Sequence, residues 1–142
     1  MRSLIVRWGP AVIVMGIIFI ASATPGSELP KFGIWDFFVK KGGHMIGYAL
    51  LATAYYHAMT NGRPFGGLRF VLAVSLAVLY AVSDEWHQKF TPGRTPSLRD
   101  VCIDASGGFI GLALWCLIRK RFSASHEAAD PRSAAIAGNR RP

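Results

Sequence analysis

Residues 68–118 read LRFVLAVSLAVLYAVSDEWHQKFTPGRTPSLRDVCIDASGGFIGLALWCLI. Two apolar runs, Leu68 to Val82 and Val101 to Ile118, flank a polar stretch that contains acids, bases, amides and an imidazole. Charge is expensive to place beside the hydrocarbon core of a bilayer and is rarely kept there without a use. The segment therefore predicts two membrane helices that end at a polar site on one membrane face.

The composition of the whole chain also indicates a membrane protein. Of its 142 residues, 51% are hydrophobic and only 17% are charged, which is too little charge for an ordinary soluble domain. Cys102 and Cys116 lie near opposite ends of the last apolar run, about 20 Å apart on a helix. This separation is too large for a disulfide, so we expect two free cysteines that serve in packing.

Four apolar segments are candidates to cross the bilayer as helices once their flanks are included. They run from Leu4 to Ala23, Gly43 to Met59, Leu68 to Val82 and Val101 to Ile118. The second is the least apolar, but the turn-rich residues 60–67 predict a helical hairpin that joins it to the third. The expected fold class is an all-α membrane protein with four transmembrane helices. Residues 21–23 also fit the Ala-x-Ala site of a cleaved secretory signal, which would leave the downstream orientation unchanged.

The basic residues predict the orientation of these helices. With both termini in the cytoplasm, the inner face holds ten Lys and Arg against two acids, and the outer face holds six against six. The whole net charge of +8 then lies inside, as the positive-inside rule favours. The high pI is thus explained by membrane topology, and we expect no nucleic-acid partner. The expected location is the inner (cytoplasmic) membrane, with several crossings.

The C-terminal residues and an aromatic run between the first two apolar segments differ in composition from the apolar runs. Residues 1–122 are expected to form the membrane domain, and residues 123–142, rich in Ala, Ser, Gly, Pro and Arg, to form a disordered cytoplasmic tail. The aromatic run from Phe32 to Val39 fits an anchor at the membrane interface, where Trp and Phe are favoured. A lid over a lipid-facing site is the alternative for that run.

This topology brings polar side chains from three parts of the chain to the outer face. Lys40, Lys41 and His44 open the second helix there, and Asp100 and Asp104 share one face at the start of the fourth. Glycines on both helices allow close approach, which would bring His44 beside Asp104. An ionised Asp104 would need a basic partner, a metal or a proton shared with a neighbour.

The polar stretch after the third apolar run contributes the remaining candidates. Glu85 and Gln88 are three residues apart, and the turn at residues 91–94 presents Arg94. Arginine suits bidentate contact with a carboxylate or a phosphate. Two roles are open for Arg94: a structural clamp on Glu85 or Asp100, or a contact to the anion of a ligand.

Several of these motifs resemble the VanZ-like family, which is named for a small membrane protein associated with teicoplanin resistance. The motifs are Lys40-x-x-x-His44-x-x-x-Tyr48, Glu85-x-x-Gln88, Pro92-Gly93-Arg94, Asp100 and Gly107-Gly108-x-x-Gly111. The resemblance covers about residues 40–117 and implies a small helical membrane protein. Family members commonly have Asn at the position of Asp104, and often Asp directly before the Lys, where this chain reads Val39-Lys40-Lys41.

Two classes of function fit these residues. The first is a protein of the cell envelope or the glycopeptide response that binds a lipid headgroup, a lipid-linked envelope precursor or an amphiphilic drug. The second is a hydrolase or transferase acting on a phosphate or ester bond of a lipid-linked substrate, with His44, Glu85 or Asp104 as acid or base. No metal or other cofactor is expected, because the acids and histidines show no familiar metal spacing. A homo-oligomer stays open. The candidate ligand-binding residues are Lys40, Lys41, His44, Tyr48, Glu85, Gln88, Arg94, Asp100 and Asp104.

Overall fold

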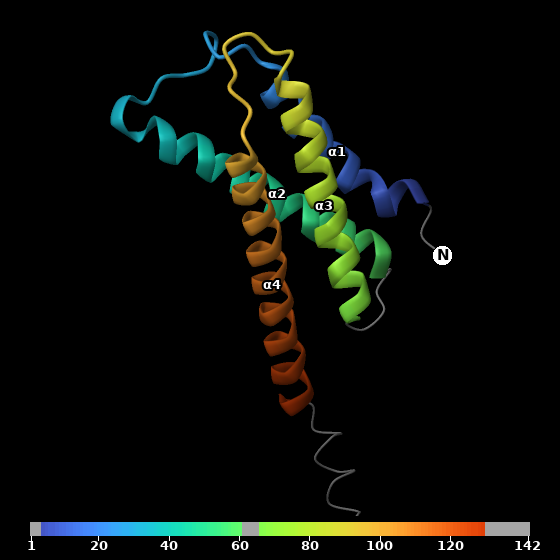
Figure 1. Ribbon diagram of the computed structural model, residues 1–142. Coiled ribbons are helices and arrows are strands. Elements are labelled where there is room, and N and C mark those ends of the chain that lie inside the picture. Colours follow the sequence, from blue (N-terminus) through green and yellow to red (C-terminus); the bar gives the residue numbers. More distant parts are fainter. Residues whose placement is uncertain (1–3, 61–65, 130–142) are drawn as a thin grey trace, which may run out of the picture. The chain divides into compact units, whose positions relative to one another are not determined.

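The computed structural model describes residues 4–60 and 66–129, and within them it contains helices and connecting segments but no β-strand. The elements are α1 (Leu4–Ala23), the short 3-10 helix η1 (Gly33–Trp35), α2 (Asp36–Thr60), α3 (Gly67–Gln88) and α4 (Leu98–Ala129), shown in Figure 1. The chain divides into two units, Met1–Leu112 and Ala113–Pro142, so α4 begins in the first and ends in the second. The all-α prediction is confirmed.

Three of the helices are long and apolar enough to cross a membrane. They are α1, α3 and the part of α4 from Leu98 to Ser123. The chain is therefore a multi-pass membrane protein. The predicted second span, within α2, is not among them, because His44, His57 and three tyrosines lower its mean hydropathy. The expectation of four apolar spans is thus confirmed for three of them.

The helices extend beyond their predicted ends into the polar residues. Helix α2 begins at Asp36 instead of Gly43, and α3 continues to Gln88. At the start of α4, the Ser97 hydroxyl accepts a hydrogen bond from the Asp100 amide at 3.3 Å, as an N-terminal cap does. Apolar runs mark the part of a helix that contacts lipid, so they underestimate helices whose ends lie in a polar environment.

The prediction of a disordered tail from Ser123 is wrong for its first residues. Helix α4 continues to Ala129, because residues 123–129 contain Ala and Glu, which favour helix, and neither Pro nor Gly. The predicted tail from residue 130 onward lies outside the described residues. Cys102 and Cys116 are both free, as expected.

Helices α1 and α2 run antiparallel. Arg7, near the start of α1, donates two hydrogen bonds to the carbonyl oxygen of Ala58, near the end of α2, at 2.6 and 3.1 Å. At the other end of the pair, Gly47 of α2 lies against the side chain of Ile18. The C-terminal end of α1 and the N-terminal half of α2 therefore face each other.

Helices α1 and α3 run parallel. The Tyr80 hydroxyl donates to the Met15 carbonyl at 2.8 Å, and further along both helices the Ser22 hydroxyl donates to Asp84, also at 2.8 Å. Both helices consequently end at the same face. There the loops that follow them are joined, since the Gly26 amide donates to the Pro92 carbonyl at 3.0 Å. Figure 1 shows these two loops side by side above the ends of α1 and α3.

The start of α4 runs parallel to α2. Lys41 pairs with Asp100 at 2.5 Å, and two turns further along α2, Ala49 lies against Gly111. Within the first unit, the direction of the chain therefore alternates from each helix to the next. The joined loops and the start of α4 lie at one end of this arrangement.

Glycines on α4 allow the close approach of α2. A Cβ atom at Gly107 would lie 2.5 Å from the carbonyl oxygen of Met45, and one at Gly111 would collide with Ala49. Gly108 faces the same helix at ordinary contact distance, next to Ala52. Small residues at this interface substitute for the larger interdigitating side chains of a soluble core.

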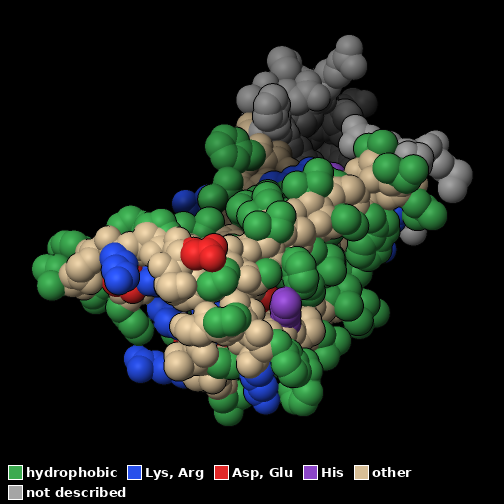
Figure 2. Space-filling view, turned by 90° about the horizontal axis from the view of Figure 1, so that it is seen from above, with side chains coloured by type: hydrophobic (Ala, Val, Ile, Leu, Met, Phe, Trp, Pro, Cys, Tyr) green, Lys and Arg blue, Asp and Glu red, His purple; other side chains and the backbone are tan. Residues whose placement is uncertain are grey.

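Polar and apolar side chains are distributed as in a protein surrounded by lipid. Large hydrophobic residues are exposed along α1 and α3, among them Ile13, Ile20 and Leu79, whereas Asp84 and Asp104 are buried. Figure 2 looks down on the end that carries the loops, where basic, acidic and histidine side chains gather with hydrophobic ones around them. Lipid would cover the exposed apolar surface.

We predict that Gly107→Ala destabilises the protein. The added methyl group would overlap the backbone of Met45, and overpacking of this kind typically costs about 1–3 kcal/mol. Gly16→Ala in α1 is the matched control, because no atom lies within 4 Å of a Cβ there. Thermal unfolding in detergent measures both variants. Equal unfolding temperatures for Gly107→Ala and the parent protein would contradict the proposed close contact.

Candidate functional site

The scaffold of the site is the pair of joined loops, residues 24–35 and 89–97. Gly93 adopts a left-handed conformation with φ of 73°, which favours glycine over residues with a side chain. A Cβ at Gly26 would collide with the Gly93 carbonyl group. The two glycines thus permit backbone contact between loops that follow different helices.

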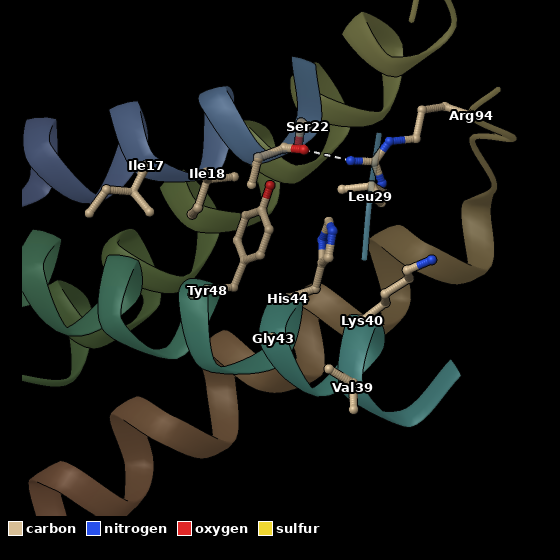
Figure 3. A pocket seen from close by; sticks show the side chains of 12 residues that line it. Ile17, Ile18, Ser22, Leu29, Val39, Lys40, Gly43, His44, Tyr48 and Arg94 are labelled. Atoms are coloured by element: carbon tan, nitrogen blue, oxygen red, sulfur yellow. Dashed lines mark hydrogen bonds between the residues drawn. The ribbon is translucent and has the colours of Figure 1, made fainter. Parts of the chain in front are cut away.

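Arg94 clamps the end of α1. Its Nη2 donates to the Ala21 carbonyl at 2.5 Å and its Nε donates to the Thr24 carbonyl at 3.2 Å. Figure 3 shows the guanidinium group pointing at the last turn of α1, with the bond to the carbonyl oxygen as a dashed line. Helix ends leave carbonyl groups without partners, and a cation there also interacts favourably with the helix dipole. A structural role is one of the two expected for Arg94, but its partners are backbone carbonyl groups and not Glu85 or Asp100.

A buried hydrogen-bonded cluster joins α1 to α3. Asp84 Oδ2 accepts hydrogen bonds from the Ser22 hydroxyl at 2.8 Å and from Gln88 Nε2 at 3.1 Å. The three side chains are buried. The sequence pattern paired Gln88 with Glu85, gave Asp84 no partner and did not indicate Ser22. The spacing of four residues between Asp84 and Gln88 could have indicated their contact, but no sequence pattern pointed to Ser22.

Glu85 lies on the same helix and faces the start of α4. Its Oε2 accepts a hydrogen bond from the Ser97 amide at 2.8 Å. The residue is only 6% exposed, and its Oε1 has no hydrogen-bond partner among the described residues. One oxygen of Glu85 therefore has a structural role, and the other is left for a further partner.

His44 and Asp104 are neighbours, as the glycine contacts predicted. The Nδ1 atom of His44 lies 3.4 Å from each carboxylate oxygen of Asp104, which is 1% exposed. The His44 imidazole is thus close enough to share a proton with Asp104, which is one of the arrangements expected for this carboxyl group. Beside this pair, Lys41 forms its ion pair with Asp100.

Lys40 and Tyr48 occupy opposite ends of the candidate site on α2. Lys40 pairs with Asp36 at 2.7 Å, and both side chains are about one-third exposed. Tyr48 is fully buried, and its ring extends from α2 toward α1 in Figure 3. Its hydroxyl has no hydrogen-bond partner among the described residues.

Two adjoining cavities lie between these elements. The first, of about 290 Å³, has largely apolar walls from α1 and α2, including Ile17, Ile18 and Val39. The second, of about 470 Å³, lies under the loops, and its walls combine charged side chains with apolar ones in similar measure. Residues common to the walls of both cavities are Leu29, Lys40, His44 and Arg94. Figure 3 shows these side chains around the first cavity.

Most of the predicted site residues meet at these cavities. The polar cavity is lined by Lys40, Lys41, His44, Glu85, Gln88, Arg94 and Asp100. Tyr48 lines the apolar cavity instead, and Asp104 lies behind His44 without lining either one. Their roles in binding or catalysis stay predictions. Among the described residues, no three His, Cys, Asp or Glu side chains are grouped so that they could hold a metal ion.

A family model described as VanZ/LLP1 matches residues 8–119. The chain belongs to this family. The match extends the resemblance inferred from residues 40–117 to include most of α1, whose last turn is held by Arg94. No curated protein and no solved structure matches the chain.

We predict that Asp84→Ala destabilises the protein more than Asp36→Ala. Loss of Asp84 leaves the buried Ser22 hydroxyl without its acceptor and Gln88 with only its long 3.4 Å bond to Ser22, which costs about 1–3 kcal/mol. The pair of Asp36 with Lys40 is partly exposed and should contribute less. Thermal unfolding in detergent compares the two variants. The role of the cluster would be refuted if both substitutions lowered the unfolding temperature equally.

Proposed function

We propose that this VanZ-type protein binds an amphiphile, with the headgroup in the polar cavity and an apolar chain in the neighbouring one. The observation that carries the proposal is that the two cavities adjoin: Lys40, His44 and Arg94 line both of them. A lipid, a lipid-linked envelope precursor and an amphiphilic drug all combine a polar head with an apolar part. A cavity lined by charged side chains beside an apolar one complements that combination.

The apolar cavity is well placed for a chain that enters from the bilayer. Its wall includes Ile17, whose helix exposes a row of large hydrophobic side chains to the surroundings. An acyl or polyprenyl chain could therefore reach the cavity without crossing water. The cavity is at the small end of the range for small-molecule sites, so it would hold one part of a chain.

Four crossings are proposed for the chain, with α2 as the fourth. Because α1 and α3 end at the same face, α2 must lead the chain back toward the opposite face before α3 begins. The polar residues of α2 face other helices at several points, for example His44 toward Asp104 and Lys41 toward Asp100. Such pairing offsets part of the cost of charge in a membrane helix.

The proposed location is the cytoplasmic membrane, with both termini inside and the joined loops outside. The excess of basic residues near the start of α1 and toward the C-terminal end of α4 supports this orientation. The cavities would then open at the outer surface, where envelope precursors and glycopeptide drugs are encountered. A role in the cell envelope or in the response to teicoplanin is the corresponding biological proposal.

A membrane-bound hydrolase or transferase is the second candidate. The favouring observation is the buried Asp104 behind His44, since a carboxylate that orients an imidazole is a common arrangement for a general base. Turnover of a lipid-linked phosphate by the purified protein, abolished in His44→Ala, would support catalysis. Binding of the same compound without turnover would favour the first function.

We predict that Gly43→Leu weakens amphiphile binding. Gly43 lines the apolar cavity, and no atom lies within 4 Å of the place where a Cβ would be added, so a larger side chain fits there without a backbone collision. A leucine would occupy space needed by about two methylene groups of the ligand, which corresponds to roughly a tenfold loss of affinity. Native mass spectrometry of the purified protein with dioleoyl phosphatidylethanolamine or phosphatidylglycerol measures the bound fraction.

The neighbouring Gly42→Leu is the matched control for this experiment. Gly42 also has open space around its Cβ position but lines neither cavity. Its substitution should leave binding unchanged. Equal binding by the Gly43→Leu variant and the parent protein would exclude the apolar cavity as the site of the chain.

We predict that Ser27 and Gly66 lie on opposite sides of the membrane. Cysteines introduced singly at these positions, in a background with Cys102→Ser and Cys116→Ser, can be labelled in intact cells with a membrane-impermeant maleimide. Ser27→Cys should react, because it lies in the outer loop, and Gly66→Cys should react only after the membrane is permeabilised. Reaction of both in intact cells would show that α2 does not cross.

A further inference from the structure

Some charged side chains that line the polar cavity have ion-pair partners within the described chain, and others do not. Lys40 forms an ion pair with Asp36, and Lys41 forms one with Asp100. Glu85 has no such partner among the described residues, since its one hydrogen bond comes from a backbone amide. Arg94 bonds to two backbone carbonyl groups, and within the described chain no carboxylate balances its charge. The cavity wall thus keeps one acid and one base without counterions.

The acid is suited to a ligand that donates hydrogen bonds. Glu85 is more than nine-tenths buried, and its Oε1 has no donor in the described part of the chain, although the residue lines the cavity. A buried carboxylate oxygen without a partner is costly, and a primary ammonium group would supply both a charge and hydrogen-bond donors. The amide of Ser97 fixes the other oxygen and so orients the carboxylate.

The base is suited to an oxyanion. The two bonds that clamp α1 use Nε and Nη2 of Arg94, and the guanidinium group has five N–H donors in all. Donors thus remain for a phosphate or carboxylate of a ligand. Arg94 lies where the polar and apolar cavities share a wall, so the anion it binds would be next to the apolar chain.

Together these groups favour a particular class of headgroup. We propose that the site binds a zwitterionic headgroup that carries a primary ammonium, held by Glu85, and a phosphate, held by Arg94. The order of the groups matches an aminophospholipid, in which the phosphate joins the ammonium-bearing end to the apolar chains. This inference rests on the proposed amphiphile-binding function and specifies the chemistry that the site selects.

The test measures binding of four probes to the full-length protein in detergent by native mass spectrometry. The lipids are dioleoyl phosphatidylethanolamine, dioleoyl phosphatidylcholine, whose quaternary ammonium has no N–H donor, and dioleoyl phosphatidylglycerol, which has no ammonium. The fourth probe, glycerophosphoethanolamine, carries the same headgroup without chains. One charged hydrogen bond corresponds to about tenfold in affinity, so phosphatidylethanolamine should bind about tenfold more tightly than either other lipid.

Glu85→Gln should abolish that preference. The amide oxygen of glutamine can still accept the Ser97 hydrogen bond, so the start of α4 keeps its contact while the negative charge is lost. The control is Glu28→Gln, an exposed acid of the outer loop that lines neither cavity. Thermal unfolding of both variants verifies that they are folded, and Glu28→Gln should retain the tenfold preference.

The outcomes separate this inference from the broader proposal. Equal binding of the three lipids, or an unchanged preference in Glu85→Gln, would overturn the headgroup assignment and leave amphiphile binding in place. Failure of all three lipids to bind would overturn both. Binding of glycerophosphoethanolamine as tightly as the lipid would retain the headgroup site but remove the chain from the proposal.

Discussion

The close contact between α2 and α4 is the constraint on which the site depends. With Gly107 against Met45 and Gly111 against Ala49, the two helix backbones approach to a distance that a side chain on α4 would prevent. This approach fixes the register in which Lys41 meets Asp100 and His44 meets Asp104. Lipid offers no hydrophobic drive for helix association, so contact between small residues and pairing between polar ones must supply it. Glycine contacts and ion pairs are therefore parts of one interface.

Helices α1 and α3 are held together by polar contacts of another kind. Ser22, Asp84 and Gln88 form a buried cluster near their ends, and Arg94 then caps the last turn of α1. These contacts lie beneath the joined loops. Polar side chains there satisfy helix ends and also form the wall of a cavity. Gln88 and Arg94, neighbours in one short sequence segment, thus both hold the helices together and line a cavity.

The sequence predicted the helices well and their polar contacts only in part. Apolar runs located α1, α3 and α4, since burial in lipid requires them, but α2 depends on tertiary pairing that hydropathy does not measure. The proximity of His44 and Asp104 followed from glycine spacing on two helices. The partner of Arg94 could not be predicted, because carbonyl groups at a helix end leave no mark in the identity of a residue. Ser22 was overlooked for a similar reason, since its contact depends on how α1 lies beside α3.

This overlap of roles determines which residues report on function. Arg94 lines both cavities, yet its loss would also release the end of α1, so a defect in such a variant would not separate binding from folding. Gln88 presents the same difficulty, because it lines the polar cavity and also donates a hydrogen bond to Asp84. Glu85 is more informative, because glutamine preserves its structural hydrogen bond and removes only the charge. In Glu85, one carboxylate oxygen has a structural partner and the other has none among the described residues. A substitution that keeps the first contact and changes the second therefore tests the chemistry of the ligand without unfolding the protein.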